Sequence, residues 1–108
     1  LEMFRDCGFD GTNSHACAPL VPCALEDAAR VWKDRVTIWG AMPSILLEPT
    51  ATDAEFQAHL RKILEMAADG ARIIVGVSDH AMPAALYDRI VAMARFFSEH
   101  GAYPIRLP

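Results

Sequence analysis

Short β-type runs alternate with longer amphipathic runs along this chain, and this alternation limits the folds open to it. Residues 36–39 and 71–77 are rich in β-branched and apolar side chains, and a weaker strand pattern covers residues 9–13. A helical pattern follows each of these segments. Strands that alternate with helices of this length form parallel sheets. The sequence therefore predicts an α/β fold made of three parallel βα units, within the 108 residues of the chain.

The three helical runs have recognisable limits. Residues 25–32 carry apolar side chains at helical spacing. Thr52 and Glu55 have the spacing of a capping box, and the apolar stripe that follows them ends at Gly70. A third helix is expected to begin at Pro83 and to end near residue 101, because proline is favoured in the first turn and glycine at the end.

The run at residues 71–77 is apolar throughout except for Arg72. Such a run is typical of a strand that is covered on both faces. The polar loop at residues 78–83 follows its carboxyl end. Because the carboxyl ends of parallel strands meet at one edge of a sheet, this loop and the loops after the other strands are expected to carry the chemistry.

Charge and composition exclude several function classes. The formal charge is −4, from 14 acidic and 10 basic residues with no basic run, which argues against a nucleic-acid or anionic-membrane partner. No apolar stretch approaches the roughly 20 residues that span a bilayer. The glycine-rich nucleotide-binding patterns and the Gly-x-Ser-x-Gly nucleophile motif are absent. Small molecules or proteins are the expected partners.

The cysteines and the first residues indicate a compartment. The chain has 3 cysteines and no Cys-x-x-Cys pair, which favours a reducing environment. Its first residues do not show the basic and then apolar pattern of a secretory signal. We therefore expect a cytoplasmic protein. Because the chain begins at Leu1, we also expect it to be part of something longer or processed.

Several landmarks occur in the order found in the C-terminal part of the uroporphyrinogen decarboxylase family. The chain resembles this family, which also includes cobalamin-linked methyltransferases, across nearly its whole length. The matching segments are Gly8–Asp10, Asp27–Ala29, Arg35–Pro43, Thr52–Glu55, Gly70–Ile74, Asp79–His80, Pro83 and Gly101–Pro104.

The resemblance implies the last three units of a (β/α)₈ barrel of the TIM type, so that residues 1–108 would form one partial domain. A complete barrel needs about 250 residues. The arginine-rich substrate loop and the catalytic aspartate of the family have no counterpart here. Three parallel strands cannot close on themselves and would leave open edges and an apolar inner face. We expect either a homo-oligomer or the remainder of a longer chain to cover them.

The implied activity is that of a carboxy-lyase in porphyrin biosynthesis, which removes CO₂ from acetate side chains of a tetrapyrrole without a cofactor. His80 resembles the family histidine that faces the substrate carboxylates, and a slip of one residue would place Asp79 there instead. The alternative is that Asp79 caps the next helix and His80 is a solvated loop residue. Trp39, Met42 and Pro43 could line the wall beneath a macrocycle, or pack in the core.

Two other functions remain open at this stage. His15, Cys17 and His80 could bind zinc, as in the corrinoid-dependent methyltransferases of the same superfamily. Otherwise Cys17 is a small buried residue and His15 a polar loop residue. The chain could also be a non-catalytic half-barrel that binds a tetrapyrrole or a protein. The isolated chain is expected to be inactive, and His59 is expected to be exposed, because charged residues neighbour it.

Overall fold

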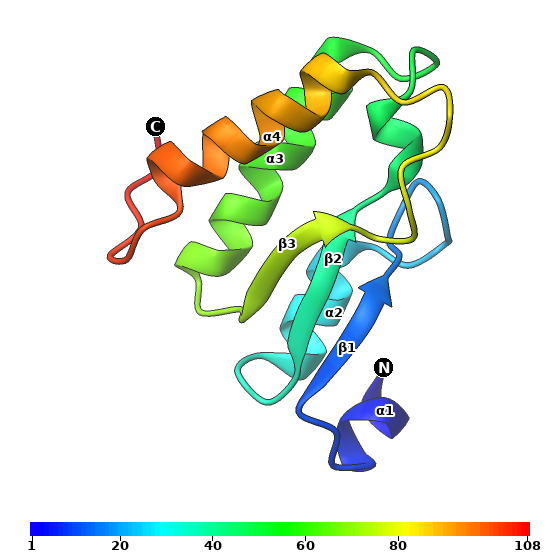
Figure 1. The fold of residues 1–108 in the computed structure, drawn as a ribbon. Helices are drawn as coiled ribbons and strands as arrows, with labels where there is room; N and C mark the ends of the chain where they lie inside the picture. The colour runs from blue at the N-terminus through cyan, green and yellow to red at the C-terminus, as the bar shows by residue number, and fades with distance from the viewer.

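The computed structural model describes all residues from 1 to 108 and contains one three-stranded parallel sheet with helices packed against it (Figure 1). The strands lie in the order β1-β2-β3, and each pair is parallel. The predicted α/β class and the parallel direction of the strands are therefore confirmed. The elements are α1 (Glu2–Asp6), β1 (Gly11–His15), α2 (Leu25–Trp32), β2 (Thr37–Met42), the 3₁₀ helix η1 (Ser44–Leu47), α3 (Asp53–Ala68), β3 (Ile73–Val77) and α4 (Tyr87–His100).

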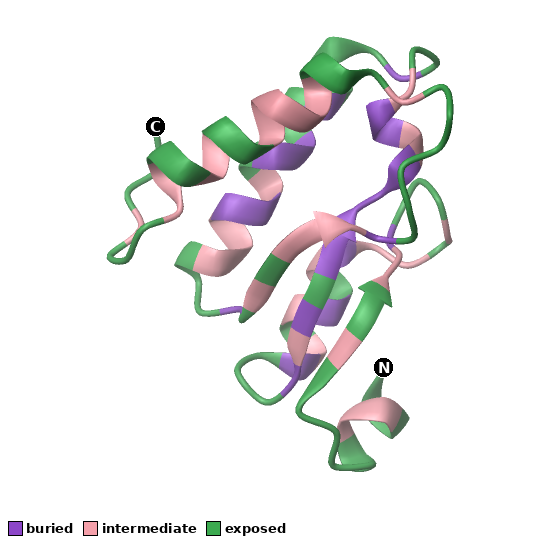
Figure 2. Ribbon diagram, viewed as in Figure 1, coloured by how far each residue is buried: buried purple, intermediate pink, exposed green.

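The helices cover one face of the sheet and leave the other uncovered. In Figure 1, α2 lies behind the strands, α3 lies beside β3, and α4 crosses in front of α3. The alternation along β2 reports the same arrangement, since Ile38 is 1% exposed and the next residue, Trp39, is 50% exposed (Figure 2). The prediction that residues 71–77 are covered on both faces is wrong, because Ile74 is 49% exposed. The chain supplies helices to one face only.

One apolar core joins α2, α3, β2 and the segment after β2. The burial of these side chains is the main favourable contribution to folding. Helix α4 adds a second, partly buried layer. The core residues are Cys17, Leu25, Ala28, Trp32, Val36, Ile38, Ala41, Met42, Leu46, Leu47, Ala51, Phe56, Leu60 and Ile63.

Strand β2 continues past its predicted end at residue 39 and bends as it does so. Gly40 has a φ of +130° and Ala41 a φ of +72°. The pairing of β2 with β3 nevertheless continues to Met42, while the register with β1 shifts between Thr12 and His15. Irregular pairing of this kind redirects side chains. Here the bend buries residues 40–43 in succession.

The helix limits agree with the sequence at α3 and differ at α4. Thr52 and Glu55 form both hydrogen bonds of the capping box, at 2.7 and 3.1 Å, and Gly70 follows the end of α3 with a φ of +105°. Helix α4 begins at Tyr87 and not at Pro83. The N–H of Leu86 instead donates to the carbonyl oxygen of Leu47 at 2.8 Å, which ties the preceding loop to η1.

None of the helices combines the length and apolarity needed to cross a membrane.

Candidate functional site

The carboxyl ends of the three strands meet at one edge of the sheet, as the sequence predicted. At this edge, Gly40 of the middle strand β2 lies between β1 and β3. A Cβ atom placed on Gly40 would lie 2.9 Å from the backbone N of His15 and 3.3 Å from the Cα of Ser78. The end of β1 and the loop after β3 therefore flank the middle strand closely.

Asp79 accepts hydrogen bonds from two side chains at this edge. The hydroxyl of Ser44 donates to its Oδ2 at 3.1 Å, and the hydroxyl of Ser78 donates to its Oδ1 at 3.3 Å. Desolvation acts to raise the pKa of Asp79, but hydrogen bonds from Ser44, Ser78 and the backbone N–H groups of residues 79 and 80 outweigh it and lower the pKa. Asp79 therefore presents a fixed negative charge at neutral pH. It does not cap α4, because that helix begins only at Tyr87.

His80 follows Asp79 in the loop and is exposed. No hydrogen bond or ion pair within the chain involves its ring, so both nitrogens are available to a ligand. An imidazole N–H can donate a hydrogen bond to a carboxylate. The two residues that the sequence singled out in this loop are therefore both accessible at the carboxyl edge.

His15 points away from that loop. Its ring lies edge-on against Trp32, with 5.2 Å between the ring centroids, and its Nε2 is buried without a hydrogen-bond partner. Burial lowers the pKa of His15. No group of three His, Cys, Asp or Glu side chains in the chain could hold a metal ion. The structure thus does not assemble His15, Cys17 and His80 as a zinc site.

Cys17 and His59 form a buried pair around one carbonyl group. The thiol of Cys17 donates to the carbonyl oxygen of Ala41 at 3.4 Å, and Nε2 of His59 lies 2.7 Å from the same oxygen. The two side chains are 4.0 Å apart. Burial raises the pKa of Cys17 to about 11, so the thiol stays protonated and is a poor nucleophile. The interpretation of Cys17 as a small buried residue is confirmed.

The prediction that His59 is exposed is wrong, because its side chain is only 6% exposed. The bend in β2 turns the carbonyl of Ala41 into the core, where a donor must satisfy it. A signal was present in the sequence. His59 lies three residues after Phe56 and four before Ile63, which places it on the apolar stripe of α3.

Of the three residues predicted to line an apolar wall, only Trp39 is accessible. Met42 and Pro43 are fully buried, and Met42 lies on the same helix-covered face of β2 as Ile38. Trp39 lies on the uncovered face, beside a shallow depression of about 350 Å³. The depression is lined by Asp10, Gly11, Thr12, Asn13, Thr37, Trp39 and Ile74.

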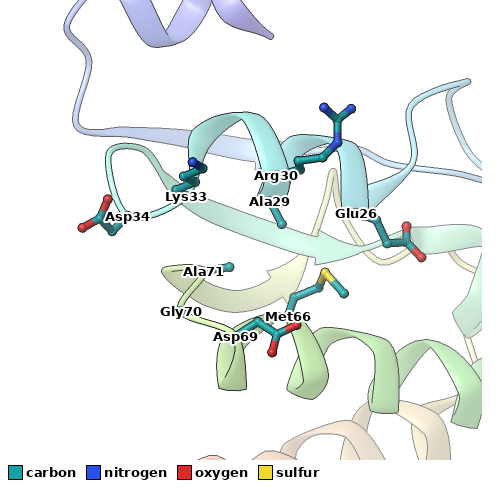
Figure 3. A pocket seen from close by; sticks show the side chains of 9 residues that line it. All are labelled: Glu26, Ala29, Arg30, Lys33, Asp34, Met66, Asp69, Gly70 and Ala71. Carbon is teal, nitrogen blue, oxygen red and sulfur yellow. The ribbon is translucent and has the colours of Figure 1, made fainter.

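The largest cavity, of about 620 Å³, lies between α2 and the end of α3 (Figure 3). It is near the amino ends of β2 and β3, at the edge opposite Asp79. Figure 3 shows its charged side chains spread around the opening, with both signs present, and not directed at one point. This arrangement offers no evident binding chemistry. The lining residues are Glu26, Ala29, Arg30, Lys33, Asp34, Met66, Asp69, Gly70 and Ala71.

Comparisons with protein-family models, with curated proteins and with solved structures find no match for this chain.

The desolvation of His15 and His59 predicts that the fold is less stable in mild acid. Burial lowers the pKa values of both His15 and His59, whereas an unfolded histidine titrates near 6.5. As the pH falls below about 6.5, the unfolded state binds protons that the folded state does not, so the free energy of unfolding decreases. Urea unfolding at about pH 7.5 and about pH 5.5 should show a lower midpoint in acid.

The variant His59→Gln tests the origin of this effect. Glutamine can still donate to the carbonyl of Ala41 but does not titrate, so the dependence on pH should become shallower. The matched control His80→Gln changes an exposed ring and should leave the dependence as it was. An unchanged pH dependence in His59→Gln would assign the effect to other groups.

Proposed function

We propose that this chain forms the C-terminal three βα units of a uroporphyrinogen-decarboxylase-like (β/α)₈ barrel. In that role it would supply part of the wall and rim of a pocket for a tetrapyrrole whose acetate side chains lose CO₂. The supporting observation is the one-sided sheet. Strands in sequential order, with the helices packed on one face, match a segment of a barrel, whereas an open doubly wound sheet has helices on both faces.

The uncovered face is the part of the molecule that this proposal explains. Trp39 and Ile74 are neighbours across β2 and β3 and leave about half of their surfaces exposed on it. In a barrel this face would be the interior, covered by the remaining strands and, near the carboxyl edge, by the ligand. Those strands would also pair with the free edges of β1 and β3.

The exposed loop after β3 offers two groups with distinct roles. His80 would donate a hydrogen bond to a substrate carboxylate. Asp79, held by Ser44 and Ser78, would fix this loop at the rim of the pocket, while the charge that stabilises the protonated pyrrole ring would come from the family aspartate that has no counterpart in this chain. The bond between the acetate methylene and its carboxylate then breaks, CO₂ leaves, and the bonding electron pair neutralises the cation. A proton then adds to the exocyclic methylene carbon and the ring carbon releases the proton it had gained, so that in the net reaction a proton replaces CO₂.

No observation favours the zinc- and corrinoid-dependent alternative. Cys17 is fully buried and donates to a carbonyl group, and the ring of His15 lies against Trp32. A zinc titration is still informative, because stoichiometric binding that is lost in His15→Ala and Cys17→Ala would replace the decarboxylase proposal with this one.

The proposal predicts binding without turnover for this chain. Uroporphyrin, the oxidised octacarboxylate macrocycle, should quench the emission of Trp39, and His80→Ala should weaken its binding by about tenfold, equivalent to one lost hydrogen bond to a charged group. The control His100→Ala lies on α4 and should bind as the unsubstituted chain does. Uroporphyrinogen should remain intact when the products are separated by chromatography.

The outcomes separate the three readings of the chain. Decarboxylation by the chain alone would contradict the expectation that essential acidic machinery lies elsewhere. Binding that is unaffected by His80→Ala would favour a non-catalytic tetrapyrrole-binding module with a different contact surface. No binding up to about 1 mM would contradict the tetrapyrrole proposal, since even weak specific sites are occupied at that concentration.

A further inference from the structure

Gly76 occupies a position in β3 where glycine is unfavourable for the strand itself. Glycine in the interior of a strand has no side chain to pack and loses more backbone entropy on folding than other residues do. Its neighbours along the strand, Val75 and Val77, are the β-branched residues that strands favour. Its backbone does not require glycine, because its φ is not among the positive values in this chain. The reason for glycine must therefore lie in the space around it.

The indole of Trp39 fills that space. A Cβ atom placed on Gly76 would lie 3.8 Å from Nε1 and 4.0 Å from Cδ1 of Trp39. Trp39 pairs directly with Ile74, so its ring leans from its own position along the sheet toward Gly76, which pairs with Ala41. This direction is toward the carboxyl edge, where the loop with Asp79 begins. An alanine at this position would make an ordinary contact with the ring, but a larger side chain would overlap it.

The N–H group of this indole is free. The N–H of Trp32 donates to the carbonyl oxygen of Leu1 at 2.8 Å, whereas the N–H of Trp39 forms no hydrogen bond within the chain. Trp39 is 50% exposed on the face that no helix covers. It therefore presents both an aromatic surface and an unused hydrogen-bond donor.

We propose that Gly76 is a positioning residue, which leaves room for the Trp39 indole over β3 and so creates a subsite for a pyrrole ring that carries carboxylates. The indole surface would contact the plane of that ring, and its N–H would donate to a carboxylate oxygen. This inference rests on the proposed function, because it names a residue that shapes the wall of the same pocket. The position of the indole can, however, be measured without any ligand.

The ligand-free test uses the variant Trp32→Phe as background, so that Trp39 is the one emitting tryptophan. Gly76→Ala should leave the emission maximum and the quenching by acrylamide unchanged, because alanine fits beside the ring. Gly76→Val should displace the ring, shift the emission to longer wavelength and increase the quenching. Circular dichroism checks folding, and Gly76→Ser provides an intermediate size if valine prevents it.

The ligand test repeats these variants with uroporphyrin. Gly76→Ala should bind like the unsubstituted chain, and Gly76→Val should bind about tenfold more weakly. Trp39→Phe retains a ring but loses the donor, so its affinity should fall by a smaller factor. Valine favours strands, so a loss of binding with Gly76→Val would not follow from a weaker strand.

Two results would overturn the inference. One is a folded Gly76→Val variant whose emission, quenching and affinity match those of the unsubstituted chain. The other is a Gly76→Ala variant that changes the emission as much as valine does, since the space is large enough for alanine. If valine displaces the indole but no variant binds uroporphyrin, the proposed function fails, and so does the subsite, while the positioning of Trp39 by Gly76 is retained.

Discussion

Replacing Gly40 by alanine is expected to destabilise the fold by roughly 2–6 kcal/mol, a large part of the total stability of a small domain. The backbone of Gly40 has a φ of +130°, which side chains with a Cβ rarely adopt. The added Cβ would also lie 2.9 Å from the backbone N and 3.0 Å from the backbone O of His15. Neither atom can move without disturbing the end of β1. Urea unfolding followed by circular dichroism measures the loss.

Gly70 provides the matched control for this substitution. It also has a positive φ, of +105°, but no atom lies within 4 Å of the position that a Cβ would take. Gly70→Ala therefore carries backbone strain without the steric overlap and should lose about 1–3 kcal/mol. Equal losses in the two variants would show that crowding between β1 and β2 contributes nothing.

The second large effect is expected at Arg89 of α4. Its guanidinium donates three hydrogen bonds, from Nη1 to the carbonyl oxygens of Leu46 and Glu48 at 2.9 and 2.7 Å and from Nη2 to that of Ala51 at 2.8 Å. It also lies 5.6 Å from the ring centroid of Phe56. Arg89→Met keeps the length of the side chain but leaves three carbonyls without their donor. We expect a loss of about 2–4 kcal/mol, because hydrogen bonds to charged groups are among the stronger ones.

Arg95 on the same helix is the control, because its side chain is exposed and forms no ion pair or hydrogen bond within the chain. Arg95→Met should change stability by no more than about 0.5 kcal/mol. Arg89→Lys should lie between wild type and Arg89→Met, since one ammonium group cannot reach all three carbonyls with the geometry of a guanidinium. An Arg89→Met variant as stable as Arg95→Met would mean that water replaces these hydrogen bonds without cost.

The limits of a helix were predicted accurately where its start and its end both carry local sequence signals. The capping box of Thr52 and Glu55 and the glycine after α3 are local features, and the structure has both. Helix α4 shows the limit of such signals. Pro83 favours a helix start, but the hydrogen bond from Leu86 to Leu47 keeps the preceding residues in a loop. A contact between distant segments therefore decided where this helix begins.

The candidate site was predictable in part. The loop with Asp79 and His80 could be placed at the carboxyl edge, because the direction of the strands follows from the alternation of strands and helices. The hydrogen bond from the Ser44 hydroxyl to Asp79 could not be predicted, because it joins segments 35 residues apart. The direction of the His15 ring was likewise set by its contact with Trp32.

Local signals were sufficient for a parallel α/β chain and for the strand ends at which its polar loops lie, since hydrophobic periodicity and helix-end signals act over a few residues. The packing of the helices settled which face of the sheet is uncovered, and with it the accessibility of Trp39 and the burial of Met42. All the helices pack on the Ile38 side of β2, and that choice depends on contacts between segments far apart in the chain. The bend at Gly40 and Ala41 likewise needs close packing between three strands, which no local pattern encodes.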